Sequence, residues 1–151
     1  MPINIVLIEP EIPNNTGNIG RLSLAAGAKL HLVKPFGFEL SDKRVKRAGL
    51  DYWKHVDLHI YEDKDSFFKQ HKDKHLVFLS SHGKKSYTEI EFEDDIFIVF
   101  GKESEGLGAE LLEKYKEDLF SIPIMSPHVR SLNLANAVSV VVYSCIRNKG
   151  I

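Results

Sequence analysis

The sequence predicts one α/β domain with a mostly parallel sheet flanked by helices. Short runs rich in Val, Ile and Phe alternate with helix-like segments along the chain. The runs Ile3–Ile8 and Ile96–Phe100 are nearly continuously apolar, as expected of strands covered on both faces. The 151 residues suit a single domain, and a hydrophobic fraction of 43% with 27% charged residues excludes a disordered chain. We therefore expect one domain over residues 1–151.

Each expected strand is a short apolar run bounded by turn residues. In chain order the expected strands are Ile3–Ile8, Leu30–Val33, Leu58–Tyr61, Leu76–Leu79, Ile96–Phe100 and Phe120–Ile124. Strands of this kind that alternate with helices form a parallel sheet, whose ligands bind at the carboxyl ends of the strands.

The expected helices begin and end at capping residues. Asn18–Ala26 ends at Gly27, and Lys43–Ala48 lies between the N-cap candidates Ser41 and Asp42 and the stop at Gly49. The last helix contains several valines, but about fourteen residues without a turn signal favour a helix over a strand. The remaining expected helices are Asp65–His71, Ala109–Lys116 and Leu134–Arg147.

Charge and cysteine content exclude several classes of protein. The net charge is −1, so a nucleic-acid binder would need a local basic patch. Cys145 is the one cysteine, which excludes an internal disulfide and a cysteine-based zinc site. No apolar run is long enough to span a membrane, and the first residues do not resemble a signal peptide. We expect a cytoplasmic protein without membrane attachment.

The histidines do not predict a metal site. His55 and His59 lie near an expected strand, where four residues span about 13 Å, too far to share one metal. His71 and His75 lie at an expected helix-to-strand turn without cysteine or clustered carboxylate partners. We interpret all four as surface residues and expect no metal.

The segment Asn14–Arg21 follows the first expected strand. Its Asn and Thr side chains are candidate caps for the following helix, and Gly17 and Gly20 permit close backbone approach. We place Arg21 in the first or second helical turn. The segment is either a plain strand–turn–helix joint with a surface arginine, or a helix N-terminus where Arg21 fixes a phosphate or hydroxyl.

The segment Gly101–Gly108 follows a buried strand and has three glycines within eight residues. Such a segment makes room for a flat ligand, although a flexible loop with solvated carboxylates is an equal alternative. Glu103 and Glu105 would repel phosphates, and the P-loop spacing is absent. The pattern favours a neutral or cationic ligand over a nucleoside triphosphate.

The last helix carries two different faces. Leu134, Val138, Val141 and Cys145 share an apolar core face, and either Ser131 or Asn133 caps the helix. A second stripe mixes polar residues with an apolar one, so a solvated face and a subunit or ligand interface are both open. Its members are Asn133, Asn136, Val140, Tyr143 and Arg147.

Together these segments resemble three motifs of the SPOUT RNA methyltransferases. Asn15–Arg21 resembles motif 1, Phe100–Leu107 resembles motif 2, and Ile122–Ile124 with Ser131–Ala137 resembles motif 3. The motifs occur in order at the ends of expected strands, and the resemblance spans almost the whole chain. The small size of the chain and the segment Ala48–Trp53 indicate the minimal branch that methylates the ribose 2′-oxygen of tRNA nucleotide 34, cytidine or modified uridine.

The resemblance implies a C-terminal trefoil knot and a homodimer, and general topology rules do not predict a knot. It also implies S-adenosyl-L-methionine as cofactor, held by the loops after three strands and by the start of the last helix. The residues that it assigns to cofactor binding are Leu79, Ser80, Phe100, Gly101, Glu103, Gly106, Ile122, Ile124, Ser131, Leu132 and Ala135.

The resemblance also implies roles in methyl transfer to tRNA. Arg21 would contact the acceptor ribose or phosphate, Asn15 would orient Arg21 or the ribose, and Glu103 would anchor the site. Ser131 and Asn133 would line the site. Tyr143 would hold the nucleotide or a phosphate, either within its own subunit or from the partner subunit. The expected RNA contacts, near the anticodon, are Arg21, Lys43, Arg44, Lys46, Arg47 and Arg130.

Several interpretations remain open. The basic cluster from Lys43 to Arg47 is equally consistent with a solvated helix face, and we expect Tyr52 and Trp53 to lie in the core. A nucleotide or flavin oxidoreductase is a further class, weakened by the missing G-x-G-x-x-G fingerprint and by the two glutamates. A ribosomal RNA methyltransferase and a non-catalytic RNA-binding or assembly factor are two more candidate classes.

Overall fold

The strands form one parallel sheet, as predicted. The computed structural model describes residues 2–150, apart from the exposure of Gly49 and the side chain of Leu50. The two ends of the expected domain 1–151 therefore lie outside the described residues. The seven-stranded sheet has the order β3-β2-β1-β6-β4-β7-β5, and all its paired strands run parallel. The strands are β1 (Asn4–Ile8), β2 (Lys29–Val33), β3 (Leu58–Tyr61), β4 (Leu76–Leu79), β5 (Lys85–Ser86), β6 (Phe97–Phe100) and β7 (Leu119–Ser121).

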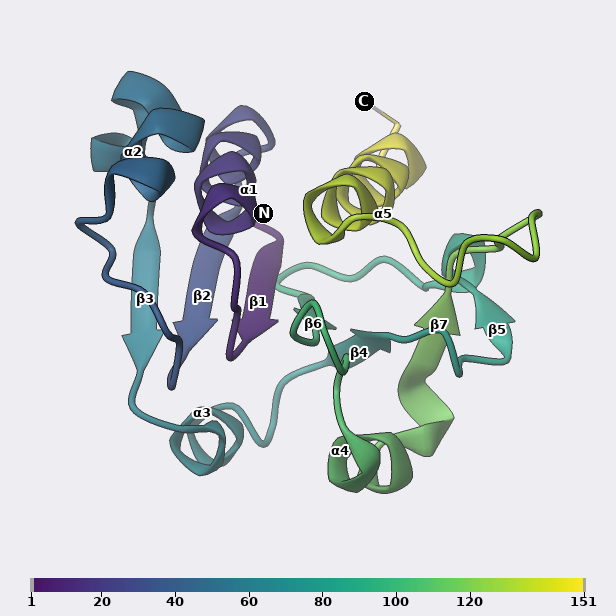
Figure 1. The fold of residues 1–151 in the computed structure, drawn as a ribbon. Coiled ribbons are helices and arrows are strands. Elements are labelled where there is room, and N and C mark those ends of the chain that lie inside the picture. The colour runs from purple at the N-terminus through teal and green to yellow at the C-terminus, as the bar shows by residue number, and fades with distance from the viewer. Residues whose placement is uncertain (1, 151) are drawn as a thin grey trace.

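Helices cover both faces of this sheet (Figure 1). One face carries α1, α2 and α5, and the other carries α3 and α4. The helices are α1 (Pro13–Ala25), α2 (Lys43–Gly49), α3 (Lys64–Gln70), α4 (Ala109–Lys114) and α5 (Leu134–Asn148), with short 3₁₀ helices at Leu50–His55, Tyr87–Glu89 and Lys116–Asp118. This arrangement confirms the predicted α/β class, a parallel sheet flanked by helices.

Alternate residues of the central strands face the two helical layers. Ile5 and Leu7 of β1 belong to a buried cluster that includes Val138 and Val141 of α5. Val6 and Ile8 belong to a second cluster on the other side of the sheet, which includes Leu111 of α4 in addition to the residues of β1. The continuous apolar runs of the sequence therefore reflect strands buried on both faces. The predicted core face of α5 is confirmed.

Some element boundaries differ from the sequence-based ones. Helix α1 begins at Pro13, five residues before the predicted start, because proline is well suited to the first helical position. The prediction that an Asn or Thr side chain caps α1 is wrong, since the N-cap is Ile12 and makes no side-chain cap bond. The last strand ends at Ser121 instead of Ile124, and the two-residue strand β5 was not predicted.

The connection between β4 and β5 crosses over β7. Strand β7 pairs with both β4 and β5, so it lies between two strands that are consecutive in the sequence. The N–H of Ser80 donates to the carbonyl of Phe120 at 2.9 Å. A Cβ atom on Gly83 would lie 2.6 Å from the carbonyl carbon of Phe120. The backbone of this connection therefore rests directly on the backbone of β7, with room only for glycine.

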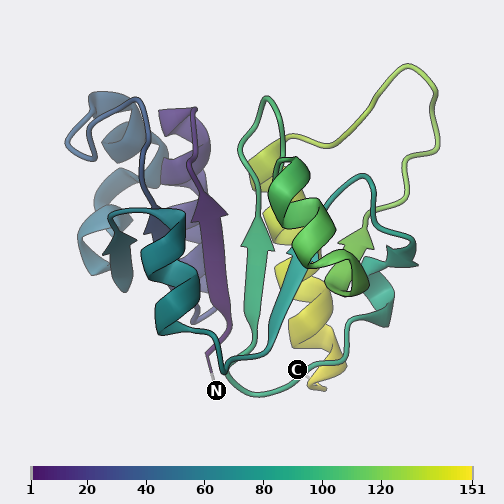
Figure 2. The same cartoon turned by 90° about the horizontal axis from the view of Figure 1, so that it is seen from below.

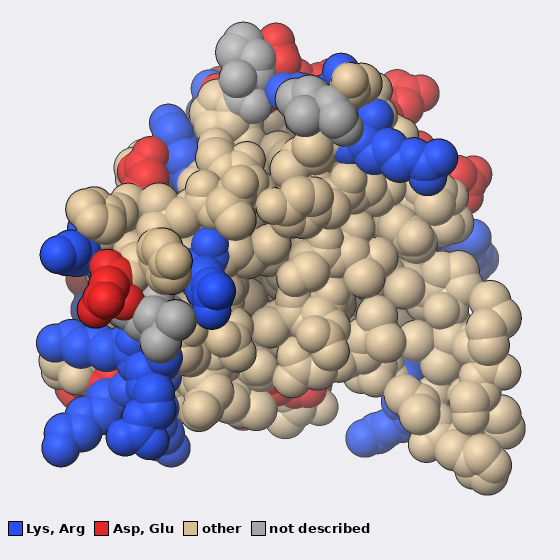
Figure 3. Space-filling model, turned by 90° about the horizontal axis from the view of Figure 1, so that it is seen from above, with Lys and Arg blue, Asp and Glu red and all other residues tan. Residues whose placement is uncertain are grey.

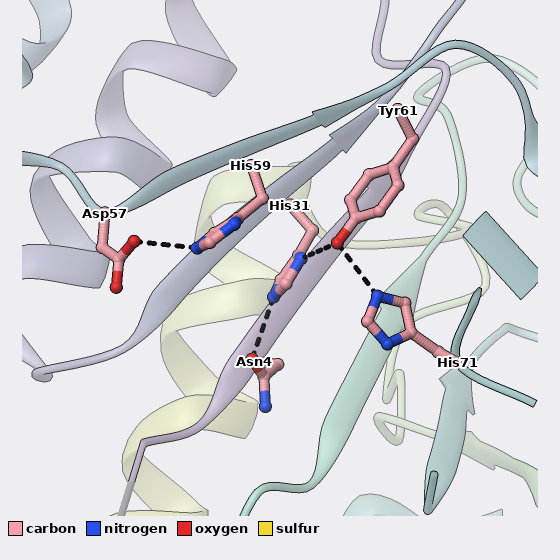
Figure 4. A network of polar contacts seen from close by, with 6 residues as sticks. All are labelled: Asn4, His31, Asp57, His59, Tyr61 and His71. Atoms are coloured by element: carbon pink, nitrogen blue, oxygen red, sulfur yellow. Dashed lines mark hydrogen bonds and ion pairs between the residues drawn. The ribbon is translucent and has the colours of Figure 1, made fainter. Parts of the chain in front are cut away.

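A buried network of polar residues joins β1, β2 and β3 (Figure 4). His31 is 3% exposed, and its Nδ1 lies 2.7 Å from Tyr61 Oη and its Nε2 lies 2.9 Å from Asn4 Oδ1. Because Asn4 Nδ2 donates to the main-chain oxygen of Asp95, its Oδ1 accepts from His31 Nε2–H. His31 Nδ1 then accepts from Tyr61, whose oxygen lies 3.0 Å from His71 Nε2. The network requires a neutral His31, and burial lowers the pKa of His31 to about 3.

The surface prediction is therefore wrong for His71, which is half-buried against Tyr61. It is also wrong for His75, which is half-buried, with Nδ1 3.2 Å from Glu93 Oε2. His55 is exposed as predicted, and His59 pairs with Asp57 at 2.8 Å at the edge of the sheet. Among residues 2–150 there is no group of three or more potential ligands placed to hold a metal, and no helix long and apolar enough to cross a membrane.

Candidate active site

The three predicted motif segments meet at the carboxyl edge of the sheet. The arrows of β1, β4 and β6 point to this edge, and the two ends of the described chain lie at the other (Figure 2). Phe100 of β6 is paired in register with Leu79 of β4, which is in turn paired with Phe120 of β7. The segments that follow these strands therefore begin side by side, as expected of a ligand site in a parallel sheet.

The turn after β1 is tied to the glycine-rich segment by reciprocal contacts. Glu9 has a φ of 51°, an uncommon conformation for a residue with a side chain. Its carboxylate lies 3.2 Å from Lys102 Nζ, and this contact raises the pKa of Lys102. The carboxylate of Glu11 accepts from the N–H of Ser104 at 2.8 Å, which lowers the pKa of Glu11. The sequence carries no local signal for these contacts, because the partners lie some ninety residues apart.

Glu103 supplies the cap that α1 lacks in its own sequence. Its two carboxylate oxygens accept hydrogen bonds from the N–H groups of Glu11 and Ile12, at 2.8 and 2.9 Å. An anion at a helix N-terminus is stabilised by the unpaired N–H groups and by the helix dipole. Glu103 therefore faces α1, and its negative charge is used within the protein instead of repelling a ligand.

A chain of side-chain hydrogen bonds connects the three motif segments. Asn15 Nδ2 donates to Glu103 Oε2 at 3.1 Å, and Asn15 Oδ1 accepts from Asn133 Nδ2 at 3.1 Å. Asn133 also caps α5, since its Oδ1 accepts from the N–H of Asn136 at 3.2 Å. Asn15 is buried at 5% exposure, so these bonds fix its orientation. The geometry joins the N-termini of α1 and α5 through the glycine-rich segment.

Arg21 lies in the third turn of α1, one turn later than predicted, because the helix begins at Pro13. Its side chain is exposed, and Cζ lies 5.4 Å from the ring centroid of Tyr52. Within residues 2–150, Arg21 makes no side-chain hydrogen bond or ion pair. Its guanidinium donors are therefore available to an external anion or hydroxyl.

The residues predicted to bind the cofactor surround the ends of β4, β6 and β7. Leu79 and Phe100, the last residues of β4 and β6, are buried. A Cβ on Gly101 would lie 2.1 Å from the carbonyl carbon of Gly106, so the turn between them closes backbone against backbone. Gly106, Ser131 and Leu132 are exposed, whereas Ser80, Gly101, Glu103, Ile122, Ile124 and Ala135 are half-buried.

Tyr143 is not part of this group within one chain. It lies ten residues after Asn133 along α5, a rise of about 15 Å along the helix axis. Tyr143 is 46% exposed and Val140 is 36% exposed, on the stripe that the sequence predicts to face solvent, a ligand or a partner subunit. The structure therefore brings together Asn15, Glu103 and Asn133, but separates Tyr143 from them.

The predicted RNA-binding residues are exposed. Figure 3 shows Lys and Arg side chains gathered over α2, next to a broad area with few charges. Lys43, Lys46 and Arg47 are exposed around the buried Val45. The Arg44 guanidinium pairs with Asp42 at 3.0 Å, which lowers the pKa of Asp42. Arg130 is exposed on the segment before α5.

The prediction of a core position is wrong for Tyr52, which is 48% exposed, and right for Trp53, which is half-buried against the core. Both belong to the 3₁₀ helix Leu50–His55 beside α1. Tyr52 is exposed, and its ring lies against Arg21 of the neighbouring helix α1. A contact between residues so far apart in the chain leaves no pattern in a single sequence.

Comparison with known proteins identifies the family. Residues 2–143 match the model of the SpoU rRNA Methylase family. The chain is 46% identical over 148 residues, 97% of this chain and 96% of the relative, to a tRNA (cytidine(34)-2′-O)-methyltransferase of Saccharophagus degradans. It is 42% identical over 149 residues, 98% of this chain and 94% of the relative, to the enzyme of the same name from Escherichia coli strain K12.

Solved structures agree with this result. One described as "Structural insights into the 2-OH methylation of C/U34 on tRNA" has a TM-score of 0.92 and 42% identity, and covers 98% of this chain and 96% of that chain. The SpoU methyltransferase AviRb from Streptomyces viridochromogenes, in complex with AdoMet, shares the fold, with a TM-score of 0.87 at 20% identity over 98% of this chain and 58% of that chain. The resemblance found in the sequence is confirmed: the chain belongs to the SpoU rRNA methylase family.

Proposed function

We propose that this protein transfers a methyl group from S-adenosylmethionine to the ribose 2′-oxygen of nucleotide 34 of tRNA. The observation that carries the proposal is the hydrogen-bonded chain Glu103–Asn15–Asn133, together with the free guanidinium of Arg21, six residues after Asn15 in α1. It occurs in a chain that is 46% identical, over almost its whole length, to an enzyme named for this reaction.

The roles of the residues follow from the chemistry of the acceptor. A ribose hydroxyl is a poor nucleophile at neutral pH, so the site must hold it in line with the methyl donor and stabilise the charge that develops on oxygen. Arg21 is always protonated and is a poor base, so its role is electrostatic. Asn15, held by Glu103, orients the acceptor next to Arg21, and Ser131 and Asn133 line the site.

The residues at the ends of β4, β6 and β7 suit S-adenosylmethionine. The adenine and the methionine chain need apolar contact together with backbone donors and acceptors, and this edge offers half-buried Ile122 and Ile124 and the exposed Leu132. Leu79, Ser80, Phe100, Gly101, Gly106 and Ala135 complete the proposed pocket. The bound cofactor supplies an activated methyl group, and AviRb, which shares the fold, is described in complex with it.

Four further features belong to this proposal. A trefoil knot is supported by the position of β7 under the connection from Ser80 to Lys84. A homodimer is supported by the exposed Val140 and Tyr143 of α5, with Tyr143 completing the partner's site. Contact with the anticodon region is supported by the exposed Lys43, Arg44, Lys46, Arg47 and Arg130. A cytoplasmic location is supported by the proposed tRNA substrate.

Methyl transfer from labelled S-adenosylmethionine to unmodified tRNA, cellular tRNA and ribosomal RNA tests the proposal. Nucleoside mapping should find 2′-O-methylation at position 34 of tRNA. Label in ribosomal RNA alone would support RNA methyl transfer but would contradict tRNA as the substrate. Calorimetry measures cofactor binding separately. If no RNA is labelled, cofactor binding would indicate an untested RNA substrate, and its absence would contradict the proposed reaction.

Arg21→Ala should keep the fold and cofactor binding and lose most methyl transfer, about 10²-fold or more, since a preorganised charged donor is worth that much in a transition state. Lys72→Ala, on the exposed segment after α3, serves as the control for loss of one surface cation. Turnover near that of the unmodified protein in Arg21→Ala would remove Arg21 from the mechanism.

A further inference from the structure

The 3₁₀ helix Leu50–His55 is fixed against α1 by Trp53. A Cβ on Gly20 would lie 2.5 and 2.7 Å from two carbons of the Trp53 ring. The absence of a side chain at Gly20 therefore lets the indole lie against the helix backbone. Trp53 also packs against the core cluster beneath α1. This contact determines where the neighbouring residue, Tyr52, is held relative to α1.

Tyr52 lies against Arg21, the residue after Gly20. Arg21 Cζ is 5.4 Å from the Tyr52 ring centroid, within the range of cation–π attraction. The ring is 48% exposed. Among residues 2–150, no hydrogen bond or ion pair holds either side chain. Adjacent residues of α1, Gly20 and Arg21, thus contact adjacent residues of the 3₁₀ helix, Trp53 and Tyr52.

An exposed arginine needs such a support to act on a transition state. An arginine side chain loses much of its rotamer freedom when it is fixed in one position, which opposes its ordering. Electrostatic stabilisation is strong only when the donor is already oriented before the charge develops. The flat face of a tyrosine restricts the guanidinium without occupying any of its five N–H donors.

We infer that Tyr52 is a positioning residue for the methyl-transfer reaction, which holds the Arg21 guanidinium toward the acceptor nucleotide through the face of its ring. This inference rests on the proposed role of Arg21. Because the ring face makes the contact and the hydroxyl makes none among the described residues, phenylalanine should replace Tyr52 and an aliphatic residue should not.

The experiment measures kcat and KM for tRNA in Tyr52→Leu and Tyr52→Phe. Tyr52→Leu should lower kcat by about two- to fivefold, the effect of an exposed cation–π pair, and by up to about thirtyfold if bound RNA removes the pair from water. Its KM should change little, and Tyr52→Phe should retain most of kcat. His55→Ala, on the same 3₁₀ helix and without a contact to Arg21, is the matched control.

A double-mutant cycle with Arg21→Ala separates a positioning role from a direct one. In the Arg21→Ala background, Tyr52→Leu should lower kcat no further. Additive losses, or a rise in KM at constant kcat, would show that Tyr52 acts on RNA directly and would overturn the inference. If Arg21→Ala alone keeps full turnover, the proposed role of Arg21 fails first, which is a distinct result.

A spectroscopic measurement does not depend on the variants being active. The Nε–Hε resonance of Arg21 should be displaced by the ring current of Tyr52 in the unmodified protein. The displacement should persist in Tyr52→Phe and vanish in Tyr52→Leu. The melting temperature and the cofactor affinity of both variants should equal those of the unmodified protein. An undisplaced resonance in the unmodified protein would overturn the inference.

Discussion

Glu103 is the residue at which the two ends of the candidate site are connected. A carboxylate between Gly101 and Gly106 suggests a ligand-facing charge when the sequence is considered alone. In the structure it accepts hydrogen bonds from Glu11, Ile12 and Asn15. Its negative charge compensates the N-terminal N–H groups of α1 and fixes the amide of Asn15. Its role is to position other residues, so a substitution should affect stability and activity together.

Glu103→Gln should destabilise the protein by about 1–3 kcal/mol, because an amide replaces the charge and turns one donor toward another donor. Activity should fall as Asn15 loses its partner. Urea unfolding and methyl-transfer kinetics measure the two effects. Glu105→Gln is the matched control, since Glu105 is exposed in the same segment and makes no hydrogen bond among the described residues. Equal effects of the two substitutions would contradict the assignment of the cap to Glu103.

His31 should make stability depend on pH. Its pKa is about 3 in the folded protein, because of burial, and about 6.5 in an unfolded chain. Between these values the unfolded state binds more protons, so the free energy of unfolding falls as the pH falls from about 6.5 toward 3. The stabilisation is complete above pH 6.5. Protonation would also break the bond in which His31 Nδ1 accepts from Tyr61.

Urea unfolding of the natural protein and of His31→Gln between pH 7.5 and 4.5 tests this expectation. Below pH 6.5 the natural protein should lose about 1.4 kcal/mol per pH unit more than the variant, the value for one proton. The variant is less stable throughout, so the comparison uses slopes instead of absolute stabilities. Parallel slopes would mean that His31 does not titrate on unfolding.

At the level of elements, α1 illustrates what the sequence alone could predict. The sequence correctly predicts a helix that ends just before Gly27. Gly27 has a φ of 65°, the left-handed conformation typical of a helix C-terminus. The start at Pro13 had a local signal, proline at the first helical position, which the prediction did not use. The cap itself comes from Glu103, about ninety residues away. Local sequence carries no signal for a distant cap. For the same reason the Arg21–Tyr52 contact could not be predicted.

The connection from β4 to β5 shows a second limit of local patterns. The apolar run that becomes β7 was recognised, but its place between β4 and β5 depends on which segments pair in space. Two-residue β5 has too few residues for a pattern of alternation. General rules for chain connections disfavour passage of one segment beneath another, so this arrangement required the family resemblance or the structure.

Gly83→Ala should therefore destabilise the protein by about 3 kcal/mol or more, because the added Cβ would lie 2.6–2.9 Å from backbone atoms of Phe120. Main-chain atoms within a sheet cannot move aside as a flexible side chain can. Thermal unfolding measures the effect. Gly37→Ala is the matched control, since a Cβ there has nothing within 4 Å and no strained φ, and should change stability little.

For the whole molecule, the net charge of −1 conceals an uneven surface. Lys and Arg gather over α2, whereas the neighbouring surface on the same side carries few charges (Figure 3). The composition therefore indicated no particular partner, whereas the cluster from Lys43 to Arg47 left a solvated helix face and an RNA contact equally open. A polyanion would bind over α2 and reach Arg21 in the adjacent α1, while the less charged area remains free for another protein surface.

The exposed stripe of α5 that contains Val140 and Tyr143 should form the contact between two copies of this chain. Val140 and Tyr143 are large hydrophobic residues of α5, yet they are 36% and 46% exposed in the single chain. Sedimentation should give about twice the 17.2 kDa of one chain, and Val140→Glu should produce monomers with little methyl transfer, because Tyr143 lies too far from Asn133 of its own chain. Ile60→Glu, at a similarly exposed residue of the edge strand β3, should remain dimeric. A monomeric natural protein with full activity would show that one chain forms the complete site, and Tyr143 would then have no role in methyl transfer.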